Sequence, residues 1–279
     1  METVAIVGVG LIGGSFAMAL RRAGFSGTIL GVSRPDTLEK AVAAGIIDSG
    51  AALEDAVPQA DLVYLSQPIG TILEVLPLLQ PLLRPYALVT DAGSTKAAIV
   101  DAAGKWIAPG QFLGGHPLAG KESRGVQSAA ADLFEGRTYV LTPLRNSDLD
   151  GASAIDFTSW LKKVGALTVV MGPGEHDRTL ALTSHLPQLA STALAALLSK
   201  ADKSVQAAFG PALLDSTRLA LSPYEIWKDI LATNYSEIAG SLDGYIATLQ
   251  NLRASLKTDG VSDYFRDGAE FAGNIRRKR

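Results

Sequence analysis

The chain has 279 residues, enough for two domains at roughly 150 residues each. Hydrophobic residues make up 47% of it, charged residues make up 19%, and the net charge is −3. These values exclude a disordered chain and a nucleic-acid binder that relies on a basic surface. The absence of cysteine excludes disulfide scaffolds, thiolate catalysis and zinc–cysteine sites. Because Met1 leads directly into a strand-like run, we expect no signal peptide and a cytoplasmic protein.

Short β-branched runs alternate with helical patterns as far as Met171. The predicted strands are Val4–Val7, Thr28–Val32, Leu62–Leu65, Ala87–Thr90, Tyr139–Thr142 and Leu167–Met171. The predicted helices between them are Leu11–Ala23, Leu38–Ala44, Thr71–Leu79 and Ala154–Val164. Such alternation predicts a parallel sheet with helices on both faces. The almost continuously apolar strands fit a sheet that is covered on both sides.

The pattern changes after Gly172-Pro173-Gly174, and no strand is predicted beyond it. The helical patterns that follow are Glu175–Ser199, Lys203–Leu214, Tyr224–Leu256 and Ser262–Ile275. The segment Thr179–Ser199 contains no Asp, Glu, Lys or Arg, which raises the alternative of a membrane span. Several Ser and Thr residues and Pro187 interrupt it, so we expect a helix that is buried by protein.

A glycine-rich loop, Gly8-Val9-Gly10-Leu11-Ile12-Gly13, joins the first predicted strand to the first predicted helix. In this spacing the first glycine permits a tight turn, the second lets the backbone approach a pyrophosphate, and the third lets the helix pack closely on the strand. The free amides of the helix N-terminus then favour the phosphate charge. The alternative is a glycine-rich turn without a ligand. The residues expected to bind the cofactor in this loop are Gly8, Gly10, Leu11, Ile12 and Gly13.

The fold predicted from these patterns is an α/β Rossmann-type dinucleotide-binding domain at residues 1–171, followed by an all-helical substrate and dimerisation domain at residues 172–279. The end of the second strand bears on the choice of cofactor, because NAD enzymes place an acid there for the ribose 2′-hydroxyl. This chain instead has Ser33 and Arg34, which suit a 2′-phosphate, so we favour NADP over NAD. In the alternative interpretation, Ser33 caps a helix that has Pro35 in its first turn, and Arg34 is only solvated.

The chain has three histidines. His116 follows the strand-like run Phe112-Leu113-Gly114-Gly115, so we expect it on a loop leaving the sheet edge, where α/β folds bind ligands. His176 lies in a polar helix start and is expected to be solvated. His185 lies in the charge-poor helix.

At this point the chain resembles a known family, the prephenate/arogenate dehydrogenases of tyrosine biosynthesis, over nearly its whole length. The first matching segments are Gly8–Gly13, Asp91-Ala92-Gly93-Ser94-Thr95-Lys96 and Gly114-Gly115-His116-Pro117-Leu118-Ala119-Gly120-Lys121-Glu122. The others are Leu133-Phe134, Tyr139-Val140-Leu141-Thr142-Pro143, Ser184-His185-Leu186-Pro187, Asp215-Ser216-Thr217-Arg218 and Trp227-Lys228-Asp229-Ile230. The segment around His116 and the later pairing of Asp215 with Arg218 are the specific ones.

The resemblance implies a metal-free oxidative decarboxylation of prephenate or arogenate to 4-hydroxyphenylpyruvate or tyrosine. Hydride leaves C4 of a cyclohexadienol for the nicotinamide, CO₂ leaves C1, and the ring becomes aromatic. The catalytic residues it implies are His116, which takes the hydroxyl proton, and Ser94, which shares that hydrogen-bond network. Without the resemblance, His116 would be a structural loop histidine and Ser94 a helix cap.

The substrate-binding residues that the resemblance implies are Arg218, Asp215, Glu122, Trp227, His185 and Gln188. Arg218 matches the residue that holds the side-chain carboxylate, and Asp215 stands three residues earlier, where it could hold the guanidinium. The alternative is a surface Asp–Arg pair, and Trp227 could equally be a core aromatic. Asp91 belongs to a matching segment and is counted with the cofactor-binding residues. The resemblance further implies a homodimer through the helical domain.

Two departures from the family pattern fall on substrate-facing positions. Gln188 stands where many members have a second histidine, and Phe209–Leu214 lacks the family's glycine-rich form. The choice between prephenate and arogenate therefore stays open. Two other functions compete: a two-domain hydroxyacid or imine reductase, and a non-catalytic NADP-sensing module. The reductase pattern of a lysine with an asparagine four residues later fails at Lys228, because position 232 is alanine.

Overall fold

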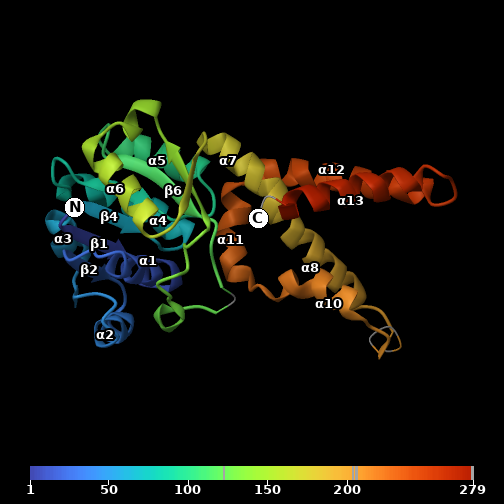
Figure 1. The fold of residues 1–279 in the computed structure, drawn as a ribbon, viewed down its shortest axis with the longest axis horizontal. Helices are drawn as coiled ribbons and strands as arrows, with labels where there is room; N and C mark the ends of the chain where they lie inside the picture. Colours follow the sequence, from blue (N-terminus) through green and yellow to red (C-terminus); the bar gives the residue numbers. More distant parts are fainter. Residues whose placement is uncertain (122, 203, 205–206, 278–279) are drawn as a thin grey trace.

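The structure is a computed structural model that describes residues 1–121, 123–202, 204 and 207–277. A sheet with helices on both faces occupies one end of the molecule, and an all-helical part occupies the other (Figure 1). The predicted fold class is therefore confirmed. The predicted boundary between residues 171 and 172 stays a prediction, although the last strand ends at Val170 and the next helix begins at Pro173.

The sheet has eight strands in the order β3-β2-β1-β4-β5-β6-β7-β8. Their bounds are β1 Thr3–Val7, β2 Thr28–Val32, β3 Ser49–Gly50, β4 Leu62–Leu65, β5 Leu88–Asp91, β6 Phe112–Pro117, β7 Thr138–Pro143 and β8 Leu167–Val170. The prediction of a parallel sheet is wrong at one pairing, because β6 and β7 run antiparallel. In the described residues between these two strands, the one helical element is the short turn Val126–Ser128, whereas a parallel pair usually needs a crossover helix.

The prediction that His116 lies on a loop is also wrong, because β6 continues through it to Pro117. The sequence signal is weak here because Gly114 and Gly115 are poor strand formers. Both glycines allow close backbone approach: a Cβ at Gly114 would collide with Thr142, and one at Gly115 would collide with the carbonyl oxygen of Asp91.

In the described part of the chain, six α-helices accompany the sheet. Their bounds are α1 Leu11–Arg22, α2 Pro35–Ala43, α3 Leu53–Ala56, α4 Ile69–Leu79, α5 Ala97–Trp106 and α6 Ala152–Lys163. Side chains of α1 and α6 share one core cluster with one face of the strands. Side chains of α3, α4 and α5 share a second cluster with the other face. Ile230 and Ile238 of the helical part join this second cluster, so the two parts of the molecule share apolar packing.

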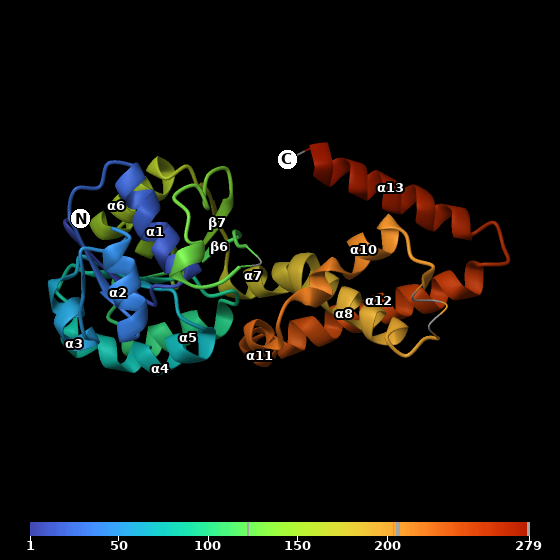
Figure 2. The same cartoon turned by 90° about the horizontal axis from the view of Figure 1, so that it is seen from below.

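The helical part begins where the sheet ends. Its elements are α7 Pro173–Leu180, a π-helical turn Ala181–His185, α8 Leu186–Leu198, α10 Pro211–Thr217, a 3₁₀ turn Arg218–Leu221, α11 Tyr224–Thr233, α12 Tyr235–Ser255 and α13 Val261–Arg277. The helix predicted over Tyr224–Leu256 is broken at Asn234. Part of the helix predicted over Lys203–Leu214 lies outside the described residues. Helix α12 extends away from the sheet, and α13 runs back from its far end (Figures 1 and 2).

Candidate active site

The glycine loop between β1 and α1 has the geometry of an anion cradle. Gly8 has a φ of +99°, which favours glycine, and a Cβ on Gly13 would collide with the carbonyl oxygen of Gly8. A Cβ on Gly10, by contrast, would meet no atom within 4 Å. Helix α1 has no side-chain cap and no acid in its first turn. Its first amides are therefore available to a phosphate beside an open backbone position.

A cavity of about 600 Å³ opens at this loop. Its walls include Gly8, Gly10, Ser33, Arg34, Asp36, Thr37, Lys40, Ser66, Gln67, Pro68 and Gly125. The Arg34 side chain is 84% exposed, and its Nε lies 4.0 Å from Asp36, which also lies 3.9 Å from Lys40 Nζ. Two cations therefore flank one anion, and the group is net positive. The alternative in which Ser33 caps α2 is wrong, because Arg34 occupies the N-cap position and no side chain caps the helix.

Two further cavities continue from the first. One of about 410 Å³ lies between the sheet and the helical part and shares Ser66, Gln67, Pro68 and Gly125 with it. Its other walls include Leu11, Ile12, Ala92, Ser94, Arg124, Ile226 and Asp229. A third cavity, of about 390 Å³, shares Ile226 with the second and is lined by Gly120, Lys121, Gln188, Arg218, Leu219, Leu221, Ser222 and Pro223. The three cavities therefore neighbour one another between the glycine loop and Arg218.

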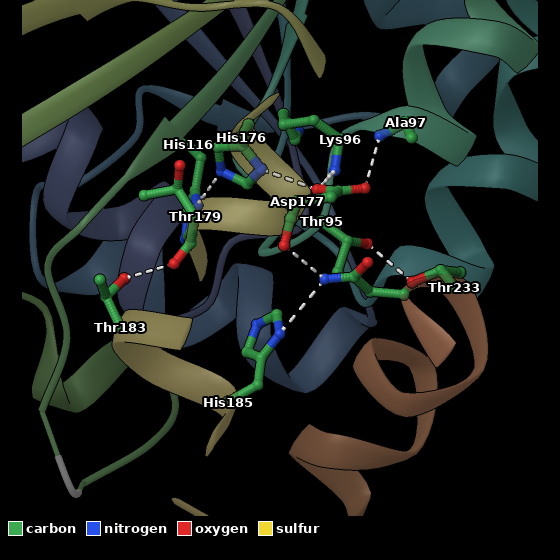
Figure 3. Close-up of polar contacts among 12 residues, drawn as sticks. Thr95, Lys96, Ala97, His116, His176, Asp177, Thr179, Thr183, His185 and Thr233 are labelled. Carbon is green, nitrogen blue, oxygen red and sulfur yellow. Dashed lines mark hydrogen bonds and ion pairs between the residues drawn. The ribbon is translucent and has the colours of Figure 1, made fainter. Parts of the chain in front are cut away.

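His116 is partly exposed and contacts a second histidine (Figure 3). Its Nδ1 lies 2.8 Å from Nε2 of His176, which comes from α7. The expectation that His176 is solvated is wrong, because its side chain is completely buried. Its neighbour Asp177 is also buried and accepts hydrogen bonds from the sheet-containing part, whereas Glu175 and Arg178 are exposed. Burial lowers the pKa of His116 well below its ordinary value, and the nearby His176, Lys96 and His185 lower it further.

Asp177 holds His176 and also caps a helix of the other part of the molecule. One carboxylate oxygen accepts hydrogen bonds from His176 Nδ1 and from the backbone N–H of Lys96, both at 2.7 Å. The other oxygen accepts from the N–H of Ala97 at 2.9 Å. Burial raises the pKa of Asp177, but these three hydrogen bonds outweigh it and hold the pKa below its ordinary value. Asp177 is therefore an ionised acceptor at neutral pH.

A buried ion pair holds the backbone just before His116. Lys96 and Asp91, both completely buried, contact each other directly. Lys96 Nζ donates to the carbonyl oxygen of Gly115 at 2.8 Å, and Asp91 accepts from the N–H of Gly115 at 3.1 Å and of Gly93 at 2.8 Å. The sequence predicts Asp91 among the cofactor-binding residues, but its carboxylate contacts buried groups of the protein itself. The Asp91–Lys96 pair fixes both backbone polar groups of the residue that precedes His116.

His185 lies in the π-helical turn and is buried. Asn234, at the break between α11 and α12, places its Nδ2 3.4 Å from Nδ1 of His185 and donates to the carbonyl oxygen of Asp177 at 2.8 Å. Because Nδ2 is a donor, His185 accepts at Nδ1 and carries its proton on Nε2. Burial lowers the pKa of His185 to about 4, despite the opposing charge of Asp177. His185 is therefore a neutral hydrogen-bond donor at physiological pH.

Of the remaining predicted residues, Ser94, Gln188 and Arg218 line the second or third cavity. Ser94 lines the second cavity, and the alternative in which it caps α5 is wrong, because Lys96 is the N-cap residue. Trp227 packs 5.9 Å from the His185 ring, centroid to centroid, and its Nε1 donates to Ser222. Gln188, buried in α8, donates to the carbonyl oxygen of Leu219 at 2.8 Å.

Arg218 begins the 3₁₀ turn after α10 and lines the third cavity. Asp215 is exposed on α10. Glu122, predicted at the mouth of the site, lies outside the described residues. In the described part of the chain, no three His, Asp or Glu side chains come close enough together to hold a metal ion. No helix there is both long and apolar enough to cross a membrane.

Sequence reasoning missed four residues of the site: Lys96, His176, Asp177 and Asn234. The first two interact with the segment around His116, and the last two link α7 to α5 and α12. The sequence signal for one of them was available, because an acid directly follows His176 and an Asp–His neighbour pair is a common orienting device.

The glycine cradle, the neighbouring cavities and the histidine pair define a two-part dinucleotide-dependent oxidoreductase. Residues 16–170 match the family model for the prephenate dehydrogenase nucleotide-binding domain, and residues 172–268 match the model for its dimerization domain. The chain belongs to the prephenate dehydrogenase family.

Individual relatives support this assignment. The prephenate dehydrogenase of Bacillus subtilis is 32% identical over 275 residues, which cover 95% of this chain and 73% of that protein. A crystal structure of the A. aeolicus prephenate dehydrogenase, in complex with hydroxyphenyl propionate and NAD⁺, is 34% identical with a TM-score of 0.86, covering 100% and 97% of the two chains. The Synechocystis arogenate dehydrogenase structure is 30% identical with a TM-score of 0.84, covering 99% and 100%.

Proposed function

We propose that this protein catalyses the NADP-dependent oxidative decarboxylation of prephenate to 4-hydroxyphenylpyruvate, a step of tyrosine biosynthesis. Membership of the prephenate dehydrogenase family supports the reaction type. The observation that carries the proposal is the position of His116. It stands at the junction of the two parts of the molecule, with one ring nitrogen bonded to His176 and its side chain partly exposed.

The glycine loop and the first cavity fit a dinucleotide. Gly10 leaves open space where a side chain would block the pyrophosphate, and the N-terminus of α1 offers free amides. The second cavity, lined by Leu11, Ile12 and Ser94, would hold the nicotinamide ring. When bound, the nicotinamide accepts a hydride from C4 of the substrate.

His116 acts as the general base. Because its pKa lies well below the ordinary value, the imidazole is neutral at physiological pH and can accept the proton of the 4-hydroxyl group. Ser94 completes the hydrogen-bond network around that hydroxyl. Loss of CO₂ from C1 leaves its electron pair in the ring, which becomes aromatic. His116 then returns the proton to the same oxygen, so the ring leaves as a phenol and the base is regenerated.

The third cavity suits the anionic end of the substrate. Its charged lining residues, within the described part of the chain, are Lys121 and Arg218. A guanidinium can hold a carboxylate with two parallel hydrogen bonds, which fixes its orientation. The side chain of prephenate is purely anionic, whereas that of arogenate also carries an ammonium group. The two cations therefore favour prephenate. Gln188 lines the same cavity, and we assign His185 and Trp227, whose rings contact each other, to the substrate as well.

A grid of two substrates against two nucleotides tests this function. Purified protein is mixed with prephenate or arogenate and with NADP or NAD, and the absorbance of the reduced nicotinamide is followed. We expect the highest kcat/KM with prephenate and NADP. If neither substrate yields reduced nucleotide, the proposal is wrong, and binding of NADP without turnover would favour a sensing module.

Arg34 and Ser33 are expected to select NADP through its 2′-phosphate. A charge-assisted hydrogen bond is worth about 1.5–3 kcal/mol, so Arg34→Ala should lower the NADP-to-NAD ratio of kcat/KM roughly ten- to a hundredfold. Ser33→Asp should lower it further, because the acid repels the phosphate and accepts the ribose hydroxyl of NAD. The measurement is initial rates with both nucleotides at saturating substrate. An equal loss for both nucleotides in Arg34→Ala would make Arg34 a structural residue.

The protein is further proposed to form a homodimer through residues 172–279, the helical domain. Residues 172–268 match a dimerization domain. In the single chain, large apolar side chains of this part are more than half exposed, among them Leu182, Leu197, Phe265 and Phe271. Their area predicts burial against a second copy. Light scattering at micromolar concentration should give twice the chain mass, and a monomer would contradict the assignment.

A further inference from the structure

The contacts between His116, His176 and Asp177 leave only one arrangement of protons for neutral rings. An ionised Asp177 can only accept, so His176 must carry a proton on the Nδ1 that faces it at 2.7 Å. A neutral His176 then presents a bare Nε2. That nitrogen lies 2.8 Å from Nδ1 of His116, so His116 must donate from Nδ1. Its own Nε2 is consequently left without a proton.

We propose that His176 and Asp177 are positioning residues that keep His116 in the tautomer with an unprotonated Nε2, the form that can accept the hydroxyl proton of the substrate. The proposal deepens the proposed function, because it rests on His116 as the base. His116 comes from β6, whereas both positioning residues come from α7 of the helical part. The reactive form of the base is thus determined by a different part of the molecule from the one that carries it.

The carboxylate of Asp177 is itself held rigidly. It accepts the N–H groups of Lys96 and Ala97 at the start of α5, so it cannot rotate without uncapping that helix. Asn234 donates to the carbonyl oxygen of the same residue, and Thr95 and Thr233 form a hydroxyl pair at 2.7 Å beside it (Figure 3). These contacts join the two parts and fix the end of the chain of hydrogen bonds that leads to His116.

The charges that face His116 favour its neutral form, because burial and the nearby His176, Lys96 and His185 all lower its pKa. Lys96, paired with Asp91, donates to the carbonyl oxygen of Gly115 in β6, and His185 lies in the π-helical turn. Asp177 is the anion at the far end of this chain of hydrogen bonds.

The tautomers can be observed directly, because the chain has only three histidines. We would label the full-length protein with ¹⁵N-histidine, record long-range ¹H–¹⁵N correlations at neutral pH, and assign the three rings with single variants. We expect His116 and His176 to be protonated at Nδ1 and bare at Nε2. A His116 ring protonated at Nε2 would overturn the proposal. The result does not depend on turnover, so it stands apart from failure of the proposed function.

Kinetics of three variants give a second, independent test. His176→Leu removes the acceptor for Nδ1 of His116, and we expect kcat to fall about 10²-fold or more, since a wrong tautomer in the Ser-His-Asp triad costs about 10⁴. His176→Gln can both accept from His116 and donate to Asp177, so it should recover much of this loss. Arg178→Gln, at an exposed position of the same helix, is the matched control.

The readouts separate a positioning role from a structural one. In His176→Leu, KM for substrate and the affinity for nucleotide should stay within about twofold of wild type, and the thermal midpoint of the folded protein is followed in parallel. Equal kcat in wild type and a folded His176→Leu would overturn the proposal, as would equal losses in the Leu and Gln variants. If His176→Leu fails to fold, the spectra of the wild-type protein still decide the matter.

Discussion

Replacing His116 with asparagine is expected to lower kcat by about 10²–10⁴-fold, the usual effect of removing a general base. Asparagine keeps a comparable volume and a hydrogen-bonding side chain but cannot accept the hydroxyl proton. The glycine cradle is remote from this change, so the affinity for nucleotide should be preserved. Steady-state kinetics and a fluorescence titration with NADPH measure the two quantities. A variant that keeps most of its activity would contradict the assignment of His116 as the base.

The pH dependence of kcat/KM provides a second test of His116 as the base. The base must be unprotonated, so kcat/KM should fall as the pH drops through the pKa of His116. That pKa lies well below the ordinary value of about 6.5. The profile of the wild type should therefore be flat around pH 6.5 and fall only in more acidic solution. In His116→Asn the residual activity should lack this fall. A wild-type limb centred at or above pH 6.5 would contradict the proposed environment of His116.

Replacing Arg218 with glutamine is expected to raise KM far more than it lowers kcat. The guanidinium binds the side-chain carboxylate equally in the ground state and the transition state, because that group does not react. Removing one partner of a charged pair costs about 2–5 kcal/mol, which corresponds to an increase in KM between about 30-fold and several thousand-fold.

Saturation curves with prephenate measure KM and kcat. Lys121→Gln, in the same cavity, tests whether the loss of any positive charge there raises KM as much as the loss of Arg218 does. A much smaller rise in Lys121→Gln would show that the planar fork of the arginine matters. An unchanged KM in Arg218→Gln would contradict a role in binding the carboxylate and favour the alternative of a surface Asp–Arg pair.

The sequence predicted the sheet well where strands are apolar and flanked by turn residues. Six strands lie within one residue of their predicted bounds, and α1 begins at Leu11 as expected. The sequence indicated a helix start near α5 only through the alternative that Ser94 is a helix cap, whereas the N-cap of α5 is Lys96 and no local side chain caps it. Its cap is Asp177, which is 80 residues further along the chain. A helix cap that is supplied by a residue distant in sequence cannot be predicted from the residues next to the helix start.

The candidate site was predictable only in part, for a similar reason. Composition and spacing, with the family resemblance, led to His116, Ser94 and Arg218. The structure places Ser94 and Arg218 on neighbouring cavities and His116 beside His176, where the two parts of the molecule meet. The surroundings of His176 are polar in sequence, so local patterning predicted a solvated side chain. Burial of that histidine depends on the docking of α7 against the sheet-containing part, a tertiary contact that hydrophobic periodicity does not encode.

Two helices of the nucleotide-binding part are capped at their N-termini by side chains of the helical part. Asp177 caps α5, and Asp229 of α11 accepts from the N–H of Gly70 in the first turn of α4 at 2.8 Å. A protein engineer who cut the chain between residues 171 and 172 would therefore leave both helix starts with unsatisfied amides. The excised sheet would also expose the apolar contacts it now shares with Ile230 and Ile238. The nucleotide-binding half is thus not a portable module, and a fusion or chimera built from it needs the acidic side chains of its neighbour restored.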